Sequence, residues 1–365
     1  MIIARYLLTN ILKTQLVIYL ILLVIFVNQK LLSVLGDVVN GDIPINIIAS
    51  LIFLYTPKLS TLILPFSFFV GLFLTMHRLQ TNNELVILSN MGLSPFFLIK
   101  IGLVLALTHA MVYSLFAFYL EPRFYSIKEN IITQYERMPE ASLAFLKPSN
   151  FVRLKEPKVV IYVENMTQDK QLKSVFINYL EKTHPNEHQP KQKFIIAASG
   201  YFNSRANMQK SLILQNGYAY QIPKHHLNYQ ITQFDEYEMI LPKKDWKIYP
   251  DEKRLDIIQL KNTDTPKAQA YFHWRIMMPF MFPILVLIAL PLSQTKVRHG
   301  NFVKIVPAFL IYFTYYIATI LARRMLEHNG SPHYLGTWWL HATVLVITIL
   351  LFYRQYFRKQ DTAIS

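Results

Sequence analysis

The apolar residues of this chain gather in six long segments, three near each end, while the middle alternates between apolar and polar residues. A helix needs about 17 to 25 mostly apolar residues to cross the hydrocarbon core of a membrane. The pattern therefore predicts an α-helical membrane protein with six transmembrane helices in two groups of three. Their expected ranges are Leu7–Leu35, Ile45–Met76, Phe96–Leu120, Trp274–Leu292, Phe302–Leu321 and Thr337–Tyr353.

Charged residues separate the middle of the chain from its two ends. Residues 121–267 hold 22 of the 37 lysines and arginines and 17 of the 22 aspartates and glutamates. This balance is typical of a water-soluble domain, whereas a hydrophobic fraction of 53% for the whole chain is high for a soluble protein. We therefore expect membrane segments at 1–120 and 268–365, with a soluble domain at 121–267 inserted between them.

The middle domain contains several short alternating runs, which turn-forming residues separate. Runs of this length and spacing predict an all-β sandwich or partly open barrel. Another β protein could add strands to its open edges, although the pattern is equally compatible with a simple spacer. In the first run, one face carries Val159, Ile161 and Val163. The runs are Lys158–Met166, Ser174–Leu180, Phe194–Ala198, Ser211–Leu214, Tyr218–Ile222 and Asn228–Ile240.

Lysines and arginines in the short loops predict the orientation of the spans. Ten lie on the side that carries both chain ends, and four lie on the other side. Because such residues accumulate in the cytoplasm, both termini are expected there and the large domain is expected outside the inner membrane. The net charge of +15 then suits anionic lipid neighbours, whereas nucleic acid would favour a basic face on the soluble domain.

The sequence lacks the motifs of common catalytic and nucleotide-binding sites. It has no cysteine, no phosphate-binding loop, no His-Glu-x-x-His and no Gly-x-Ser-x-Gly. His184 and His188 have a ligand-like spacing, but Pro185 lies between them and a solvated loop is the favoured interpretation. We therefore expect no metal site, no bound cofactor and no enzymatic activity in this chain.

The predicted spans also lack aspartate and glutamate. Ion-coupled transporters usually place ionisable groups at membrane depth, and here His109 stands alone in the middle of the third span. A packed, hydrogen-bonded histidine is the favoured interpretation. Any energy source must therefore come from another protein.

The loop between the second and third spans predicts a short helix at 81–92. Thr81 and Glu84 have the spacing of a capping box, and Gly92 is well placed to end the helix. Its apolar face could dock into a groove of a cytosolic partner, or the segment could be a turn on the lipid surface. That face would consist of Leu85, Leu88 and Met91.

Basic residues mark the outer ends of two spans. Lys30 ends the first span, and Arg323 and Arg324 end the fifth. A lysine in this position usually reaches toward lipid headgroups. Two basic clusters at the same depth could also hold one anionic headgroup.

Several motifs occur in an order that matches a known family. They are Met1-Ile2-Ile3 with Arg5-Tyr6-Leu7, Gly41-Asp42-Ile43-Pro44, Leu62-Ile63-Leu64-Pro65, Glu84 with Gly92-Leu93-Ser94, Asn262-Thr263-Asp264-Thr265 with Trp274-Arg275, Pro291-Leu292-Ser293 and Pro307-Ala308. With them the chain resembles the F-type permeases, more than the G-type ones, of the LptF/LptG family of the lipopolysaccharide-export ABC transporter.

The resemblance implies a permease that pairs with a G-type sibling and with a cytosolic ATPase dimer, which binds ATP and magnesium. Lipopolysaccharide would enter a cavity gated by spans one and five and pass into an outer β-jellyroll domain. A periplasmic β-jellyroll bridge protein would receive it. A small single-span membrane-anchored subunit is a further expected partner.

The resemblance also assigns roles to individual residues. Glu84 would contact the ATPase, and Lys30 matches a basic position near the phosphates of the substrate. Ser33 stands where the family often has a second basic residue, so Arg323 or Arg324 would take over its role. The acyl chains would pass along the inner face of the β domain at Val159, Ile161 and Val163.

A rival of a different class is a non-transporting membrane scaffold whose outer β domain binds another envelope protein. The two hypotheses differ in their partners, because export requires an ATPase that purifies together with the chain.

Overall fold

The computed structural model divides the chain into two compact units. The helical unit comprises Met1–Lys30, Ile52–Ile127 and Pro250–Ser365, and the β unit comprises Leu31–Leu51 and Lys128–Tyr249. These borders differ from the range 121–267 that the sequence predicts for the outer domain. The structure describes residues 2–39, 43, 45–137, 148–154, 159–167, 171–181, 191–204, 210–222, 229–240, 252–293, 305–328 and 336–356.

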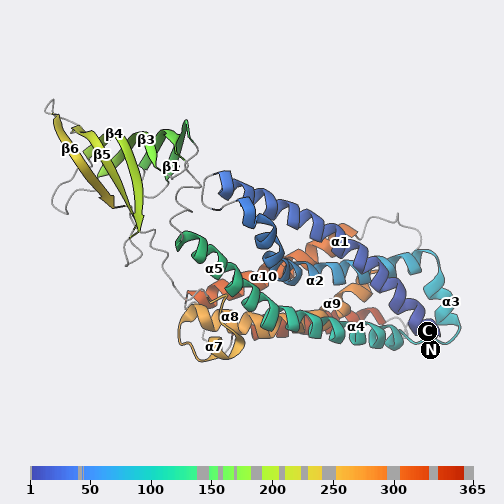
Figure 1. Ribbon diagram of the computed structural model, residues 1–365. Coiled ribbons are helices and arrows are strands. Elements are labelled where there is room, and N and C mark those ends of the chain that lie inside the picture. The colour runs from blue at the N-terminus through green and yellow to red at the C-terminus, as the bar shows by residue number, and fades with distance from the viewer. Residues whose placement is uncertain are drawn as a thin grey trace. The chain divides into compact units, whose positions relative to one another are not determined.

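The described helices follow the apolar segments of the sequence (Figure 1). Before the β unit they are α1 (Ile2–Val39), η1 (Ile45–Ile47), α2 (Ile48–Thr81), α3 (Glu84–Asn90), α4 (Pro95–Leu115), the π-helical turn η2 (Phe116–Leu120) and α5 (Glu121–Arg137). After it they are α7 (Ile257–Lys261), α8 (Pro266–Met277), η3 (Met278–Phe280), α9 (Met281–Ser293), α10 (Ile305–Glu327) and α11 (Trp338–Tyr356).

Five helical stretches of the described chain are long and apolar enough to cross a membrane. The sixth predicted span corresponds to α11, in which the apolar stretch Trp338–Leu350 is shorter. The sequence therefore predicts these helices correctly, while the count of six spans stays a prediction. The five stretches are Ile2–Val39, Ile45–Thr81, Phe96–Gln134, Pro266–Ser293 and Ile305–Glu327.

The third span extends further than its apolar residues indicate. We predicted its end at Leu120, but the helix continues through η2 and α5 to Arg137. Because Glu121–Arg137 is rich in polar residues, hydropathy marks the end of the apolar part and not the end of the helix. The residues assigned by sequence to the start of the outer domain thus prolong a span.

Local capping explains where α4 and α8 begin. The Ser94 side chain accepts a hydrogen bond from the Phe96 amide at 3.3 Å, and the Thr265 side chain accepts one from Ala268 at 3.2 Å. In both helices proline occupies the first turn, where its missing N–H costs no helical hydrogen bond. These caps set the ends of helices that hydropathy alone leaves open.

Two glycines allow neighbouring helices to approach closely. A Cβ added at Gly71 of α2 would lie 2.7 Å from the Cβ and 2.8 Å from the Cα of Gln15 in α1. A Cβ added at Gly102 of α4 would lie 2.5 Å from a methyl carbon of Val286 in α9. Small residues are favoured at such crossings in membranes because packing, and not water, drives helix association.

The β unit contains one antiparallel sheet in which the strand order equals the chain order (Figure 1). The prediction of strands is confirmed, because the described residues between Asn150 and Ile240 form a six-stranded meander, while the helices α5 and α7 occupy the two ends of the predicted range 121–267. The jellyroll arrangement stays a prediction. The strands are β1 (Asn150–Leu154), β2 (Val159–Met166), β3 (Leu172–Glu181), β4 (Lys191–Ser204), β5 (Lys210–Ile222) and β6 (Gln230–Ile240).

A line of interrupted pairing crosses the sheet from β2 to β6. The register places five residues on this line, and none of them forms a ladder pair. Ser174 and Asn216 adopt left-handed backbone angles there, with φ of 51° and 53°. We call it the kink line, because Ser174 and Asn216 leave the extended backbone conformation there. Its residues are Glu164, Ser174, Ala198, Asn216 and Asp235.

The buried residues change parity at the kink line. In β5 the residues of the core cluster are Leu212 and Leu214 before the line and Ala219 after it, while Ser211 and Ile213 are also buried but lie outside this cluster. In β3 the cluster residues are Leu172 before it, and Val175 with Ile177 after it. Because side chains alternate along a strand, this shift keeps apolar residues on one face, the inner face, across the whole sheet.

The contact between Gly71 and Gln15 leads to a first prediction. Gly71→Ala should lower the free energy of unfolding of the purified chain by about 1–3 kcal/mol, because the added methyl group meets the α1 backbone. Thermal unfolding in detergent measures the effect.

Gly36→Ala is the matched control, since nothing lies within 4 Å of a Cβ at that helical position. It should leave stability unchanged or raise it by about 0.5–1 kcal/mol, because alanine favours a helix. Equal stability of the two variants would contradict the close packing of α1 on α2.

Candidate functional site

The helix α3 lies between two residues with left-handed backbone angles. Asn83 precedes it with a φ of 59°, and Gly92 follows it with a φ of 87°. The amides of Gly92 and Leu93 bond to the carbonyls of Ser89 and Leu88, so Gly92 ends the helix as predicted. The predicted capping box is wrong, because the Thr81 hydroxyl donates to the His77 carbonyl and Asn83 is the N-cap.

The face that α3 exposes differs from the predicted one. Leu85 is 9% exposed and belongs to the core of the helical unit, and Leu88 packs against that core. The exposed apolar side chains are Val86, Ile87 and Met91, at 42%, 57% and 72%. Of the three residues predicted for docking, Met91 is exposed, Leu88 is partly buried and Leu85 is buried, and their contact with a partner stays a prediction.

Glu84 bonds to the first helix of the chain. The Tyr6 hydroxyl of α1 donates a hydrogen bond to its carboxylate at 2.8 Å. Asn82 donates a longer one, at 3.4 Å, from the turn before α3. Glu84, for which the sequence predicted a contact with the ATPase, thus also accepts a hydrogen bond from Tyr6 within the chain. The sequence motif around Glu84 gave no sign of this bond.

Each predicted headgroup residue has its own surroundings. The Lys30 ammonium lies 4.1 Å from the ring centre of Tyr55. The Arg323 guanidinium lies 4.9 Å from the ring centres of Tyr271 and Trp274, and its Nε lies 3.4 Å from a Glu327 carboxylate oxygen. Arg324 is exposed. Arg323 is therefore held by its own neighbours, while Arg324 presents its charge to the surroundings.

The residues predicted for an acyl-chain path lie on the inner face of the sheet. Val159, Ile161 and Val163 are at most 2% exposed and belong to the core of the β unit. The three side chains share one face of β2, as predicted, and they are buried in the core of the unit.

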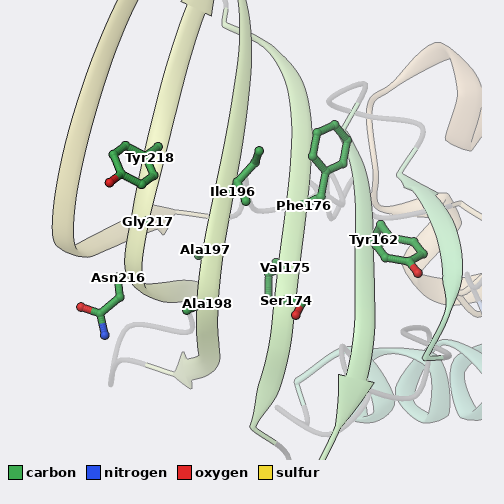
Figure 2. A pocket seen from close by; sticks show the side chains of 10 residues that line it. All are labelled: Tyr162, Ser174, Val175, Phe176, Ile196, Ala197, Ala198, Asn216, Gly217 and Tyr218. Carbon is green, nitrogen blue, oxygen red and sulfur yellow. The ribbon is translucent and has the colours of Figure 1, made fainter.

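Sequence reasoning missed a groove on the opposite, outer face. A pocket of about 510 Å³ lies along the kink line. Figure 2 shows the side chains that line it, among them Tyr162, Phe176, Ile196 and Tyr218. These four residues follow one another across β2–β5 in the register. Alternation in the sequence marks both faces as partly apolar, but only the paired register brings the aromatic rings into one row.

Polar groups within the helical unit find partners across helices. His109 lies 2.7 Å from the Gln15 amide nitrogen and 2.7 Å from the Leu105 carbonyl, which confirms a hydrogen-bonded role. The carbonyl requires a proton on Nδ1, so Nε2 accepts from Gln15. Buried Arg275 donates to the carbonyls of Leu255 and Lys253, a role without a sequence signal.

The described residues contain no group of three or more histidines, aspartates or glutamates that could hold a metal ion. His184 and His188 lie outside the described residues.

Comparisons with known proteins cover almost the whole chain. Residues 5–354 match the family described as Lipopolysaccharide export system permease LptF/LptG. Lipopolysaccharide export system permease protein LptF of Escherichia coli (strain K12) is 30% identical over 352 residues, 96% of this chain and 93% of that protein. Proteins of the same name from Escherichia coli O157:H7 and Shigella flexneri match equally. The chain therefore belongs to the lipopolysaccharide export system permease LptF/LptG family.

Proposed function

We propose that this chain is the F-type permease subunit of an ABC transporter that extracts lipopolysaccharide from the inner membrane. Membership of a permease family makes it a transport subunit and not an enzyme. The observation that carries the proposal is α3, a short helix that the core holds in place while Val86, Ile87 and Met91 stay exposed. This apolar face suits the groove of a cytosolic ATPase.

The energy for transport comes from that partner. This chain has no phosphate-binding loop, so ATP and magnesium bind to the ATPase dimer. In this proposal both termini and α3 are cytoplasmic, α11 is the sixth span, and the β unit is a periplasmic jellyroll. Closure of the ATPase dimer pushes α3, and the helices around the cavity then expel the lipid toward the β unit.

The substrate suits the chemistry of the helical unit. Apolar helix surfaces would face the acyl chains, while Lys30 and Arg324 would meet the phosphates. Arg323 has a smaller part in this proposal than Arg324, because it already stacks on Tyr271 and Trp274.

The proposed assembly contains a G-type sibling, which pairs with this chain to enclose the cavity. A small single-span subunit lies at one gate, and a periplasmic β-jellyroll protein receives the lipid from the β unit. The inner face at Val159, Ile161 and Val163 would have to open for the acyl chains to pass, since these side chains are buried.

The scaffold alternative draws on the outer face of the sheet. Its aromatic row continues from Tyr162 to Phe151, where the two ring centres lie 4.7 Å apart and Phe151 is 69% exposed. Exposed aromatic rings are common in protein interfaces. A scaffold would bind an envelope protein there without an ATPase.

The docking role of α3 generates the next prediction. Ile87→Asp should reduce retention of the ATPase at least about tenfold, because a carboxylate replaces an apolar contact that would be buried. Glu84→Lys should also release the ATPase. Co-purification of the complex from membranes measures both effects.

Ser89→Asp is the matched control, since this residue is exposed on α3 and lies nearly opposite Ile87, two positions farther along the helix. It should retain the ATPase. Full retention by Ile87→Asp and Glu84→Lys would show that α3 is not the contact, and an absence of any ATPase from the unmodified complex would favour the scaffold.

The charge of Lys30 is testable in the purified complex. Lys30→Asp should weaken the stimulation of ATP hydrolysis by lipopolysaccharide about tenfold in apparent affinity, because a charge-assisted contact to phosphate is lost. Lys30→Arg keeps the charge and should retain most of the stimulation. Unchanged stimulation in Lys30→Asp would assign Lys30 to contacts with bulk lipid.

The path of the acyl chains can be traced with photoreactive residues. A photoreactive residue at Ile161, on the inner face, should capture lipopolysaccharide when the complex hydrolyses ATP. The same residue at Tyr162, on the outer face, is the matched control and should capture little. Capture from position 162 alone would contradict an inner path and point to the groove along the kink line.

A further inference from the structure

The helices α1 and α3 are joined at their cytoplasmic ends in two ways. The Tyr6 hydroxyl donates to the Glu84 carboxylate at 2.8 Å. The residues that follow each of these two, Leu7 and Leu85, are 0% and 9% exposed and belong to one core. The hydrogen bond from Tyr6 is therefore the direct link between the start of α1 and α3, and both helices pack on the same core.

The two ends of α3 allow it to move as one piece. Asn83 and Gly92 bound it with positive φ angles, so the chain changes direction sharply on both sides of a seven-residue helix. A push on its exposed face reaches the rest of the molecule through the residues that attach it. Those are the buried Leu85, the partly buried Leu88 and the bond from Glu84 to Tyr6.

Farther along, α1 comes close to the backbone of α2 at Gln15. Among the described glycines, Gly71 is the one whose added Cβ would meet the Cα and amide nitrogen of a residue in α1, Gln15. The same Gln15 side chain bonds to His109 of α4 at 2.7 Å. Two helices thus hold α1 at Gln15, which makes this residue a pivot.

Beyond the pivot, polar side chains at the helix surface attach α1 to α2. The Tyr19 and Ser60 hydroxyls lie 2.7 Å apart, and Lys30 lies over the ring of Tyr55. Between these contacts α1 is largely exposed, with Leu20, Val24 and Ile25 at 49%, 59% and 54%. Beyond Gln15 the described part of α1 is thus held at these points and at the buried Val34 and is exposed between them, so a turn about Gln15 would have to exchange these contacts.

We propose that Tyr6 transmits the movement of α3 to α1, which turns as a lever about the contact between Gln15 and Gly71. Tyr6 is then a positioning residue for transport and touches neither the lipid nor the ATPase. This inference rests on the proposed function, since it is the ATPase that moves α3. It adds a link within this chain between the docking helix and the first span.

The test uses the complete complex with its ATPase. Tyr6→Phe removes only the hydroxyl and should keep the ATPase bound, because Val86, Ile87 and Met91 are unchanged. The stimulation of ATP hydrolysis by lipopolysaccharide should fall about threefold to tenfold, the range expected for one hydrogen bond to a charged group at a partly exposed site.

Two controls separate transmission from simpler effects. Tyr119→Phe removes a tyrosine hydroxyl from a side chain that is 72% exposed, and it should change nothing. Asn82→Ala removes the other hydrogen bond to Glu84 without touching α1, and it should leave most of the stimulation. A loss in Asn82→Ala equal to that in Tyr6→Phe would overturn the inference, because orientation of Glu84 alone would then explain both.

A distance measurement reports the movement of the lever itself. The chain has no cysteine, so Val24→Cys in α1 and Leu107→Cys in α4 give two exposed labelling positions once cysteines of the partners are replaced. Nucleotide should change the spin-label distance in the Tyr119→Phe background, and the change should fall by at least about half with Tyr6→Phe.

Three results would overturn the inference. One is an equal distance change and equal stimulation in Tyr6→Phe, and a second is release of the ATPase by Tyr6→Phe, which would make the hydroxyl part of docking. The third is a wild-type complex that binds its ATPase and responds to lipopolysaccharide without any movement of α1. These three results would leave the proposed function standing. If the unmodified chain recruits no ATPase, the proposed function itself is wrong.

Discussion

Hydrocarbon offers polar groups no water, and this constraint determines how the helical unit is assembled. Every backbone N–H and C=O must bond within a helix, and polar side chains must meet partners on neighbouring helices. Gln15 with His109 fastens α1 to α4, and Tyr315 with His341 fastens α10 to α11 at 2.5 Å. Glycine at Gly71 and Gly102 then lets the helices approach until their apolar side chains fill the remaining space.

The same constraint shapes how the chain obtains energy. The described spans gather their polar groups into a few contacts between helices, and the chain has no phosphate-binding loop. In the proposed function, energy for work on a lipid comes from a partner, and α3 would receive it because its buried side anchors it while its other side stays exposed. The bond from Glu84 to Tyr6 connects that helix to α1, the least buried of the apolar helices.

Long apolar segments were enough to predict the membrane helices, because a helix that faces lipid is apolar over its whole length. Alternation of apolar and polar residues was enough to predict the strands of the middle domain, because successive side chains of a strand point to opposite faces. The end of the third span was missed because α5 is helical but polar. At the site, the sequence placed Gly92 and Glu84 in the right element, yet it chose Leu85 and Leu88 for docking. A short apolar helix gives the same pattern for its core side and its partner side, and only packing separates them. The kink line could not be predicted from the sequence, because its residues come together only when the pairing of five strands is known.

In the proposed function this permease exports lipopolysaccharide with energy from ATP hydrolysis in a partner ATPase, which acts through α3. The most direct test of this proposal is to purify the chain from native membranes without overproducing any partner, and to identify the accompanying polypeptides and lipid by mass spectrometry. The account predicts an ATPase with a phosphate-binding loop, a second permease of the LptF/LptG family and lipopolysaccharide in one complex. Recovery of the chain with envelope proteins alone, and with neither ATPase nor lipopolysaccharide, would contradict it.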